Sequence, residues 1–439
     1  MIWLWVACSE QKPIEETGET VEVPPVESIF TNAQQHLEEL ERIAMENDGN
    51  RFVGTSGYDH SVSYVKERLE EADYVVDIHR FELRQFVVVS EPELLQNSES
   101  VTSDIGVFEY SPSGSGEGKI IPVDLQIPPG STNSSTSGCQ ASDYADFETG
   151  GVALLQRGSC TFSEKAERAQ DAGAAMVLIF NEGQNGRRST LEGTLGENTD
   201  LNIPVLGLSY EMGVYLNERA GESIQFSVET AFDMTESYNI FAERQVGDPN
   251  RVMMIGAHLD SVQEGPGIND NGSGVAGILA MAEQFSAESF ESSNRIRFAF
   301  WGAEEIGLVG SYKYIQEQSE ENRSKILMYL NFDMIASPNY VNFIYDGDGS
   351  QGPRGPRGSD NIEDVFKDAF RDNDLSYEET PFDGRSDYGP FIAVGIPAGG
   401  LFSGAEAIKS PQEEESFGGR SGESYDECYH RECDSLENI

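Results

Sequence analysis

The sequence predicts an α/β protein in which a mixed, mostly parallel sheet flanked by helices is interrupted by a β-rich insert. Short apolar runs that suit strands buried on both faces end in charged residues, and helical patterns follow them. Roughly residues 87–232 differ from the rest, being rich in Ser, Gly and short alternating runs. With 439 residues, the chain is also longer than one hydrophobic core normally organises. We therefore expect one domain from residues 29–86 and 233–439 and a second from residues 87–232.

The composition narrows the range of partners. The formal net charge of −48 excludes nucleic acid and anionic membrane surfaces as electrostatic partners. Such a charge keeps a protein soluble and is compatible with a saline or extracellular setting, but it does not specify a substrate. No stretch approaches the roughly 20 consecutive apolar residues that a membrane-spanning helix needs.

The first 28 residues differ from a folded domain. Residues 1–7 are apolar, Cys8 follows, and residues 9–27 are rich in Glu, Pro and Thr, which is typical of a disordered tether. The segment resembles the end of a bacterial lipoprotein signal with Cys8 as the lipidated residue. It lacks a basic start, which a missed upstream start would explain, and it carries Trp5 where leucine is usual. The hypothesis is a truncated signal and tether (residues 1–28), an extracytoplasmic location and a membrane tether through lipidated Cys8.

The five cysteines point to an oxidising compartment. None forms a C-x-x-C pair, so a zinc site made of thiolates is not expected. One cysteine is N-terminal and the other four form two pairs of neighbours along the chain, which predicts two disulfides and one odd residue. The alternative is five buried thiols. The positions are Cys8, Cys139, Cys160, Cys428 and Cys433.

Helices and strands alternate along the predicted catalytic part. Apolar residues at three- and four-residue spacings predict one helix from Ile29 to about Ala44 and a second from Ser61 to Ala72. The segment 51–57 between them is typical of a turn, and residues 74–81 alternate like a strand.

The sheet is organised around a strand at residues 252–261. An apolar run there ends in His258-Leu259-Asp260, and alternation along a strand would place both polar side chains on one side. A carboxylate beside an imidazole orients a metal-bound histidine through its other ring nitrogen. A glycine-rich turn that contains Asp270 then leads into a helix that Asn271 or Ser273 could cap. The alternative is an ordinary buried strand and turn, with His258 satisfied in the core.

Two more predicted strands end in carboxylates. The run 295–301 is followed by Glu304-Glu305, and the run 326–332 is followed by Asp333. In open α/β sheets, ligands bind at the carboxyl edge of the strands. We therefore expect these carboxylates and the histidine of the central strand to lie at one edge.

One histidine, several carboxylates and a second histidine, His430, suit two borderline divalent ions, and zinc fits this set best. Two ions bring four positive charges; three ligand carboxylates remove three, and a bridging hydroxide removes the fourth. Ions about 3.5–4 Å apart acidify a bridging water and polarise a scissile carbonyl. A carboxylate that is not fully engaged by metal must then take the water's proton. Glu304 and Glu305 supply both kinds of carboxylate, the pattern alone leaves their roles open, and a solvated acidic turn is the alternative.

Five motifs in this order resemble the double-zinc aminopeptidase family, which includes secreted bacterial aminopeptidases and the vacuolar aminopeptidase Y type. The resemblance extends from about Ile29 to the C-terminus and implies a zinc exopeptidase fold. The motifs are His258-x-Asp260, Asp270 within Asn269-Asp270-Asn271-Gly272-Ser273-Gly274, Glu304-Glu305, Asn331-x-Asp333-Met334 and Tyr429-His430-x-x-Cys433-Asp434.

The resemblance implies a role for each matching residue. Two zinc ions would share five ligands: His258 and Asp333 on one ion, Glu305 and His430 on the other, and Asp270 bridging them. Glu304 would be the general base and Asp260 the partner that orients His258. Tyr429 would stabilise the tetrahedral oxyanion, and Arg385, in Gly-Arg-Ser-Asp-Tyr, would lie beside the substrate end. No ligand position is substituted, which argues against the metal-free, receptor-like relatives.

The insert resembles the protease-associated domain through Arg157-Gly158-x-Cys160-x-Phe162 and the Ala-rich helix that follows. The resemblance implies a disulfide between Cys139 and Cys160. A second, between Cys428 and Cys433, would close the small loop that carries Tyr429 and His430. The insert contains no nucleophile–base pair or ligand cluster, so we expect it to bind or shield rather than to catalyse.

These features together predict a secreted or surface-tethered zinc aminopeptidase that hydrolyses the N-terminal peptide bond of peptides with a free N-terminus. One alternative is a carboxypeptidase or dipeptidase on the same fold. Another is a binding protein whose catalytic fold is vestigial, and the complete ligand set weighs against it. The sequence indicates neither the side-chain preference nor the oligomeric state.

Overall fold

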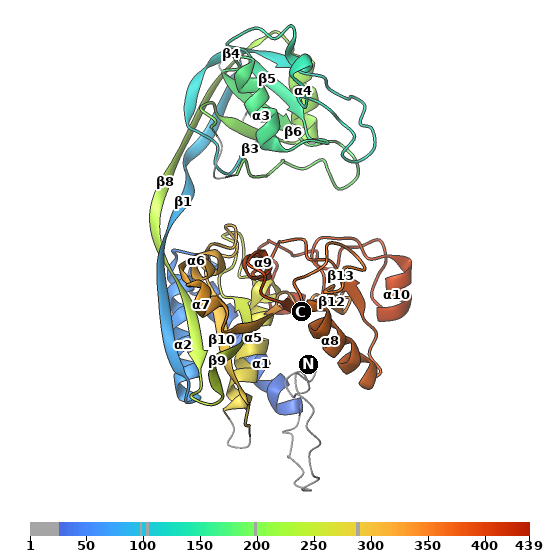
Figure 1. The fold of residues 1–439 in the computed structure, drawn as a ribbon. Coiled ribbons are helices and arrows are strands. Elements are labelled where there is room, and N and C mark those ends of the chain that lie inside the picture. Colours follow the sequence, from blue (N-terminus) through green and yellow to red (C-terminus); the bar gives the residue numbers. More distant parts are fainter. Residues whose placement is uncertain (1–25, 97–98, 102–104, 197–199, 287–289) are drawn as a thin grey trace. The chain divides into compact units, whose positions relative to one another are not determined.

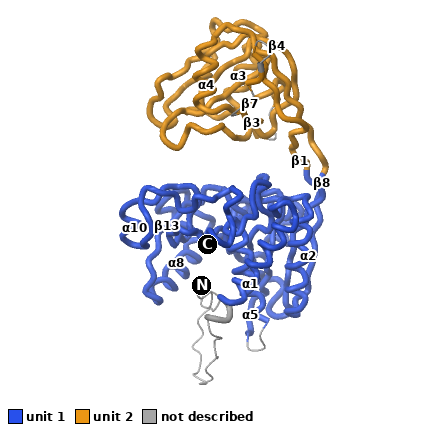
Figure 2. The backbone as a smooth tube through the Cα atoms, turned by 180° about the vertical axis from the view of Figure 1, so that it is seen from behind, with its two compact units in different colours: residues 1–83, 235–439 blue, residues 84–234 orange. Residues whose placement is uncertain are grey.

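The computed structural model describes residues 26–96, 99–101, 105–196, 200–286 and 290–439. They form two compact units, one made of the described residues up to Leu83 together with those from Thr235 to Ile439, and the other of those from Arg84 to Met234 (Figure 2). Two long strands, β1 (Val75–Gln96) and β8 (Ser223–Glu243), pass from the first unit into the second (Figure 1).

The predicted signal and tether fall mostly outside the described residues, and so does Cys8. The first helix begins at Val26, so residues 26–28, which the sequence assigned to the tether, are helical. This helix starts directly after Pro25, and proline is tolerated at the start of a helix but not in its interior. None of the described helices is long and apolar enough to cross a membrane.

The sheet of the first unit is mixed and mostly parallel, as predicted. Its strand order is β13-β12-β14-β11-β9-β10-β8, and β1 pairs with β8. Strands β10, β9, β11 and β14 are parallel neighbours, whereas β8 runs antiparallel to β10 and β12 runs antiparallel to β14. The strands are β9 (Asp248–His258), β10 (Asn294–Trp301), β11 (Ile326–Phe332), β12 (Phe343–Tyr345), β13 (Glu378–Thr380) and β14 (Ala398–Phe402).

Helices cover both faces of this sheet, which explains the continuous apolar runs of its central strands. Ile255 and Ala257 pack on the face covered by α1, α2, α5 and α8, whereas Val252 and Met254 pack on the face covered by α6 and α9. The helical segments of this unit are α1 (Val26–Met45), α2 (Ser56–Glu71), η2 (Ile268–Ser273), α5 (Gly274–Phe285), α6 (Val309–Glu317), α7 (Glu320–Arg323), α8 (Ser359–Asp372), α9 (Tyr388–Ala393), α10 (Pro411–Phe417) and η3 (Leu436–Asn438).

The second helix begins earlier than the sequence predicted. It starts at Ser56 instead of Ser61, because the Thr55 side chain accepts the N–H of Tyr58 and caps it. The turn expected at residues 51–57 therefore ends at the helix cap.

The second unit contains a smaller sheet with helices on both of its faces. Strands β4, β5, β6 and β7 are parallel neighbours, and β3 lies antiparallel to β7. The elements are β2 (Glu99–Ser100), β3 (Ile105–Val107), β4 (Gly114–Pro122), η1 (Ala141–Tyr144), β5 (Val152–Gln156), α3 (Phe162–Asp171), β6 (Met176–Phe180), β7 (Val205–Leu208) and α4 (Tyr210–Asn217). The disulfide Cys139–Cys160, implied by the resemblance, is present, with the Cα atoms 5.8 Å apart.

Candidate metal centre

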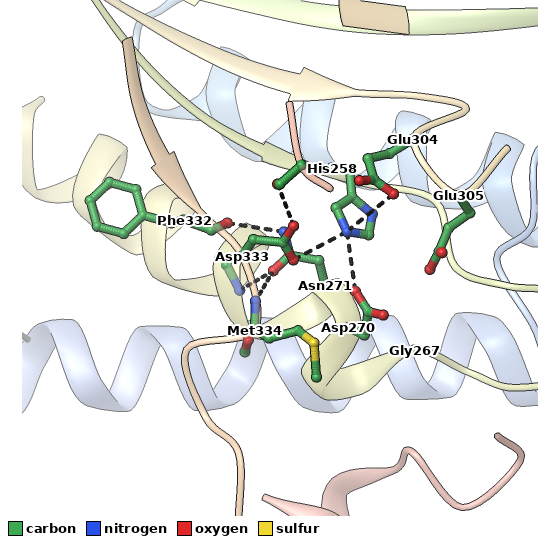
Figure 3. A network of polar contacts seen from close by, with 12 residues as sticks. His258, Gly267, Asp270, Asn271, Glu304, Glu305, Phe332, Asp333 and Met334 are labelled. Atoms are coloured by element: carbon green, nitrogen blue, oxygen red, sulfur yellow. Dashed lines mark hydrogen bonds and ion pairs between the residues drawn. The ribbon is translucent and has the colours of Figure 1, made fainter. Parts of the chain in front are cut away.

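Charged side chains gather where β9 and β11 end (Figure 3). His258 is the last residue of β9, and Asp333 directly follows β11. The Nε2 atom of His258 lies 3.2 Å from Oδ1 of Asp270 and 3.3 Å from Oδ1 of Asp333. All three side chains are buried. The strand ends therefore meet as the sequence predicted.

Asp270 lies between two histidines. Its Oδ1 atom faces His258, and its Oδ2 atom lies 3.2 Å from Nε2 of His430. The carboxylate of Asp434 accepts the main-chain N–H groups of Asn269 and Asp270, at 2.7 and 3.0 Å. Because both amides are held, the Asp270 carboxylate is presented between the two imidazoles.

Asn271 ties the irregular turn η2 to the end of β11. Its Nδ2 atom donates to the carbonyl of Phe332 at 2.9 Å, and its Oδ1 atom accepts the N–H of Met334 at 3.2 Å (Figure 3). The same Oδ1 atom accepts the first main-chain N–H of α5 at 2.9 Å. Of the two caps that the sequence allowed, Asn271 is therefore the one that acts, because the Ser273 side chain makes no capping hydrogen bond.

The turn after β10 carries Glu304 and Glu305. The Asp260 carboxylate accepts both of their main-chain N–H groups, at 3.2 and 3.3 Å. Oε2 of Glu305 lies 3.1 Å from Nε2 of His430, whereas Oε2 of Glu304 lies 3.9 Å from Nε2 of His258. The two adjacent glutamates thus face different imidazoles, and only Glu305 is in close contact with one.

The position of Asp260 differs from the simple strand picture. β9 ends at His258, so the alternation that the sequence argument extended to Asp260 does not apply there. Nδ1 of His258 lies 3.1 Å from the main-chain oxygen of Asp260 and 3.8 Å from its Oδ1. The main-chain carbonyl is therefore the nearer partner of the ring. It engages Nδ1 and leaves Nε2 directed at the carboxylates.

The centre holds more carboxylates than cationic groups. Burial opposes protonation of His258, but Glu304 and its neighbouring carboxylates outweigh burial and raise the pKa of His258 well above its usual value. Burial, with Asp270 nearby, raises the pKa of Glu305 to about 7. Burial also raises the pKa of Glu304 well above its usual range, and Glu305 adds to this effect. Burial and neighbouring negative charge together disfavour the ionised form of these glutamates, and a bound cation would offset both effects.

Two overlapping groups of side chains fit metal ions. One group is His258, Asp270 and Glu305 and the other is His258, Glu304 and Asp333; within each, the ligand atoms lie within 4.8 Å of one another. Oε1 of Glu305 and Oδ1 of Asp333 are buried without a hydrogen bond. A buried carboxylate oxygen in that state is costly unless a cation compensates it. Imidazole and carboxylate oxygen are also ligands that zinc accepts, so the side chains fit a divalent metal.

A third acidic group, at Asp346, Asp348 and Glu363, differs from these two. Asp346 accepts four main-chain N–H groups and Glu363 accepts two. Lys367 also pairs with Glu363. These carboxylates hold a loop together, and we assign no ion to them.

A short disulfide loop carries His430. The bond between Cys428 and Cys433, with Cα atoms 5.2 Å apart, confirms the pairing implied by the resemblance. The ring of Tyr429 stacks on that of His430, with centroids 3.8 Å apart. The loop therefore presents an imidazole and a phenol to the same centre.

Arg385 contacts this loop. Its Nη2 atom donates to the Tyr429 hydroxyl at 3.0 Å, and its Nη1 atom pairs with Glu406 at 2.9 Å. Burial raises the pKa of Tyr429 above its usual value, so the phenol keeps its proton and can donate a hydrogen bond.

The two histidines, Asp270, Asp333, the two adjacent glutamates, Tyr429 and Arg385 line one cavity of about 580 Å³, whereas Asp260 is not among its lining residues. The remaining wall is largely apolar and aromatic, with Phe343, Tyr345, Phe402 and Tyr425 among its residues. The sequence-predicted residues that line it are His258, Asp270, Glu304, Glu305, Asp333, Arg385, Tyr429 and His430.

Sequence reasoning missed Arg51, which supports the centre from behind. Arg51 is fully buried, and its guanidinium donates to the main-chain carbonyls of Leu259, Pro266 and Gly267. It therefore holds the loop between His258 and Asp270. A lone arginine before a turn carries no local signal for this, because its carbonyl partners lie 208 to 216 positions further along the chain.

Two further supporting residues lie inside motifs that the sequence analysis quoted without giving them a role. One is Asp434, which holds the main chain at Asp270. The other is Ser386, whose hydroxyl donates to Oδ2 of Asp333 at 2.5 Å. Their positions beside a cysteine and an arginine of the motifs were the available signal.

The chain is similar to known proteins over most of its length. Residues 239–439 match Peptidase family M28, and residues 118–216 match the PA domain. An aminopeptidase of Pseudomonas aeruginosa is 46% identical over 416 residues, which is 93% of this chain and 77% of the relative. The probable lipoprotein aminopeptidase LpqL of Mycobacterium tuberculosis is 40% identical over 423 residues, 94% of this chain and 81% of the relative. Among solved structures, the aminopeptidase from Aneurinibacillus sp. strain AM-1 superimposes with a TM-score of 0.71 at 26% identity, covering 94% of this chain and 90% of that one.

Proposed function

This chain belongs to peptidase family M28 and is an aminopeptidase, and we propose that it releases the N-terminal residue of peptides at a centre of two zinc ions. The observation that carries the proposal is the Asp270 carboxylate, whose two oxygens each lie 3.2 Å from the Nε2 atom of a different histidine. A carboxylate that reaches two imidazole ligands at once is suited to bridge two metal ions.

The remaining ligands follow from the neighbours of each histidine. Asp333 lies beside His258, and Glu305 lies beside His430. His258 and Asp333 would hold one ion, Glu305 and His430 the other, and Asp270 both. Zinc ions bound there supply an acidified water and polarise the scissile carbonyl.

Glu304 is the proposed general base. Its carboxylate lines the cavity but lies 3.9 Å from the nearest imidazole nitrogen, so it is the less engaged of the two glutamates. A carboxylate whose pKa is raised by burial is well matched to accept a proton from water and return it to the leaving amine. Asp260 positions it through the main chain.

Tyr429 is the proposed oxyanion donor. Its hydroxyl lines the cavity beside His430, and Arg385 donates to it. A hydroxyl that already accepts from a guanidinium directs its own proton elsewhere, and in the cavity that proton is available to a developing negative oxygen.

The charges of the cavity favour an aminopeptidase over a carboxypeptidase or dipeptidase. Of the described residues that line it, Arg385 is the only Lys or Arg, and Glu406 pairs with it. Apart from the metal ions, a substrate α-carboxylate would therefore find no unpaired cation, whereas the carboxylates of Glu304 and Asp383, which are not proposed ligands, attract a protonated α-amine. Comparing free peptides with N-acetylated peptides tests this preference, and cleavage of both at similar rates would contradict it.

An extracytoplasmic location is part of the proposal. Two disulfides form in an oxidising compartment, and one relative is named a lipoprotein. Cys8 is the candidate for lipidation. Intact-mass analysis of protein from the native host should find the diacylglycerol group, and an unmodified soluble form that begins elsewhere would indicate simple secretion.

Metal removal tests the central claim. Activity towards a leucine anilide should disappear with a chelator and return with zinc, and the zinc-loaded chain should contain two ions. His258→Ala and His430→Ala should lose zinc and activity together. Full activity of either variant in chelating buffer would overturn the assignment.

A further inference from the structure

A chain of hydrogen bonds runs through the core of the sheet and ends on Asp333. The Nε1 atom of Trp301 donates to the Tyr329 hydroxyl at 2.8 Å, and that hydroxyl donates to Oδ1 of Asn331 at 2.9 Å. Nδ2 of Asn331 donates to the Ser386 hydroxyl at 2.8 Å, and that hydroxyl donates to Oδ2 of Asp333 at 2.5 Å. We refer to these five residues as the Trp301 chain.

The direction of the Trp301 chain is determined by its first member. An indole N–H can only donate a hydrogen bond. The Tyr329 hydroxyl therefore accepts from Trp301 and donates its own proton to Asn331. The Asn331 amide then has to present oxygen to Tyr329 and nitrogen to Ser386. Ser386 in turn has one proton left, which goes to Asp333. The chain therefore presents a donor, never an acceptor, to that carboxylate.

The Trp301 chain lies in the protein core, where a glycine leaves room for its first hydrogen bond. All five residues are buried, with exposed fractions of 0% for Trp301 and Tyr329 and 8% for Asp333. The first link spans the central strand, because Trp301 is on β10 and Tyr329 on β11, with β9 between them. Gly256 of β9 leaves the necessary space: a Cβ atom there would collide with the Tyr329 hydroxyl and with Nε1 of Trp301. A glycine inside a strand often marks such a close approach.

We infer that Tyr329, Asn331 and Ser386 are positioning residues for metal binding, an inference that rests on the proposed metal centre. Ser386 engages Oδ2 of Asp333 and leaves Oδ1 buried without a hydrogen bond, facing His258. The Trp301 chain thereby orients the Asp333 carboxylate and keeps it an acceptor. Its Oδ1 atom stays available to the ion beside His258. Partners that hydrogen-bond a ligating carboxylate orient it and tune its affinity for the metal.

Removal of the last donor is the direct test. Metal-free protein carrying Ser386→Ala, titrated with zinc against a competing chelator, should show about 10–100-fold weaker binding of one ion. The other ion should bind as in the wild type. Ser386→Thr keeps a hydroxyl and should restore most of the affinity. Ser61→Ala is the matched control, since Ser61 is equally buried and its hydroxyl donates only to the Gly57 carbonyl within α2.

A second variant tests whether a change further along the Trp301 chain also affects zinc binding. Tyr329→Phe deletes one hydroxyl and frees the Asn331 amide to turn, so it should also weaken one zinc ion, though less than the serine change. Tyr314→Phe is its control: Tyr314 packs in the same aromatic cluster, contacts Trp301 and carries a buried hydroxyl outside the chain.

The outcomes separate this inference from the proposed function. If the wild type binds no zinc, the metal centre itself is wrong. If the wild type binds zinc but Ser386→Ala keeps wild-type affinity, or loses it no more than Ser61→Ala, the positioning role is wrong. If Ser386→Thr binds as weakly as Ser386→Ala, the hydroxyl is not the active group and the inference fails in the same way.

Discussion

Replacing Glu304 by Gln tests the chemical assignment of the centre at a single atom. The amide has the size of the carboxylate, so the turn after β10 keeps its shape, and the Asp260 carboxylate still accepts the main-chain N–H groups of residues 304 and 305. The variant cannot accept a proton from water. We therefore expect it to fold, to retain both zinc ions and to bind substrate.

The expected loss in turnover can be bounded. Glu304 is not one of the five proposed zinc ligands, and its Oε2 atom lies 3.9 Å from Nε2 of His258, so the proposed ligand set stays complete in this variant. The change then removes only general-base catalysis, which is worth about two to four orders of magnitude, or about 3–5 kcal/mol of transition-state stabilisation. Glu305→Gln should behave differently. Glu305 contacts His430 at 3.1 Å, and its loss should lower zinc content as well as rate.

The assay measures kcat, KM and zinc per chain for both variants and for Glu321→Gln, an exposed glutamate, as the control. The acidic limb of the pH–rate profile should vanish from the residual activity of Glu304→Gln. Loss of zinc from Glu304→Gln with retention in Glu305→Gln would mean that the two roles are exchanged. Near-normal rates and zinc content in both variants would refute the placement of the active site at this edge.

Three further predictions concern the framework of the two units. Replacing both Cys428 and Cys433 by Ser removes a restraint worth about 2 kcal/mol on a short loop. One zinc ion and the activity should therefore be lost, while thermal unfolding stays cooperative. The equivalent change to the disulfide of the insert should leave the zinc content unchanged. Asp434→Asn leaves only one acceptor oxygen for the two main-chain N–H groups at Asp270, and zinc affinity should fall about 10-fold, as a chelator competition would measure. Burial lowers the pKa of Lys165 to about 8, so between about pH 8 and the unfolded value of about 10.5 the unfolded chain binds more protons than the folded one. The free energy of unfolding of the wild type should therefore rise by about 3 kcal/mol relative to Lys165→Met across that window in denaturant titrations, and Lys119→Met, an exposed lysine, should show no such trend.

The sequence predicted the edge of the sheet well because its signal is local. His258 and Asp333 follow apolar runs that are long enough to be strands and too short to be helices of a core. Parallel strands in an open sheet bring such ends together without further information. The alternation of side chains along a strand does not extend beyond the strand's end. Because β9 ends at His258, the alternation does not apply to Asp260, and the nearer partner of the His258 ring is the main-chain carbonyl of Asp260.

The contacts of the residues that support the centre could not be predicted, because their partners lie far away along the chain. Arg51 is buried against carbonyls of residues 259–267, and Ser386 reaches a carboxylate 53 positions earlier. Neither contact leaves a periodic pattern or a spacing in the sequence. The start of the second helix was predicted wrongly for a different reason. Its cap, Thr55, lies inside a stretch that resembles a turn.

Gly256 has a consequence for how sequences of this fold can diverge. A single methyl group at this position would meet two side chains of neighbouring strands at once, so no substitution of Gly256 alone is tolerated without displacing Trp301 or Tyr329. Losing either aromatic, in turn, removes the reason for the glycine. Across related sequences, the three positions should therefore change as a set or not at all. Covariation of these three buried positions, which contact no substrate, would then indicate that selection acts on Asp333.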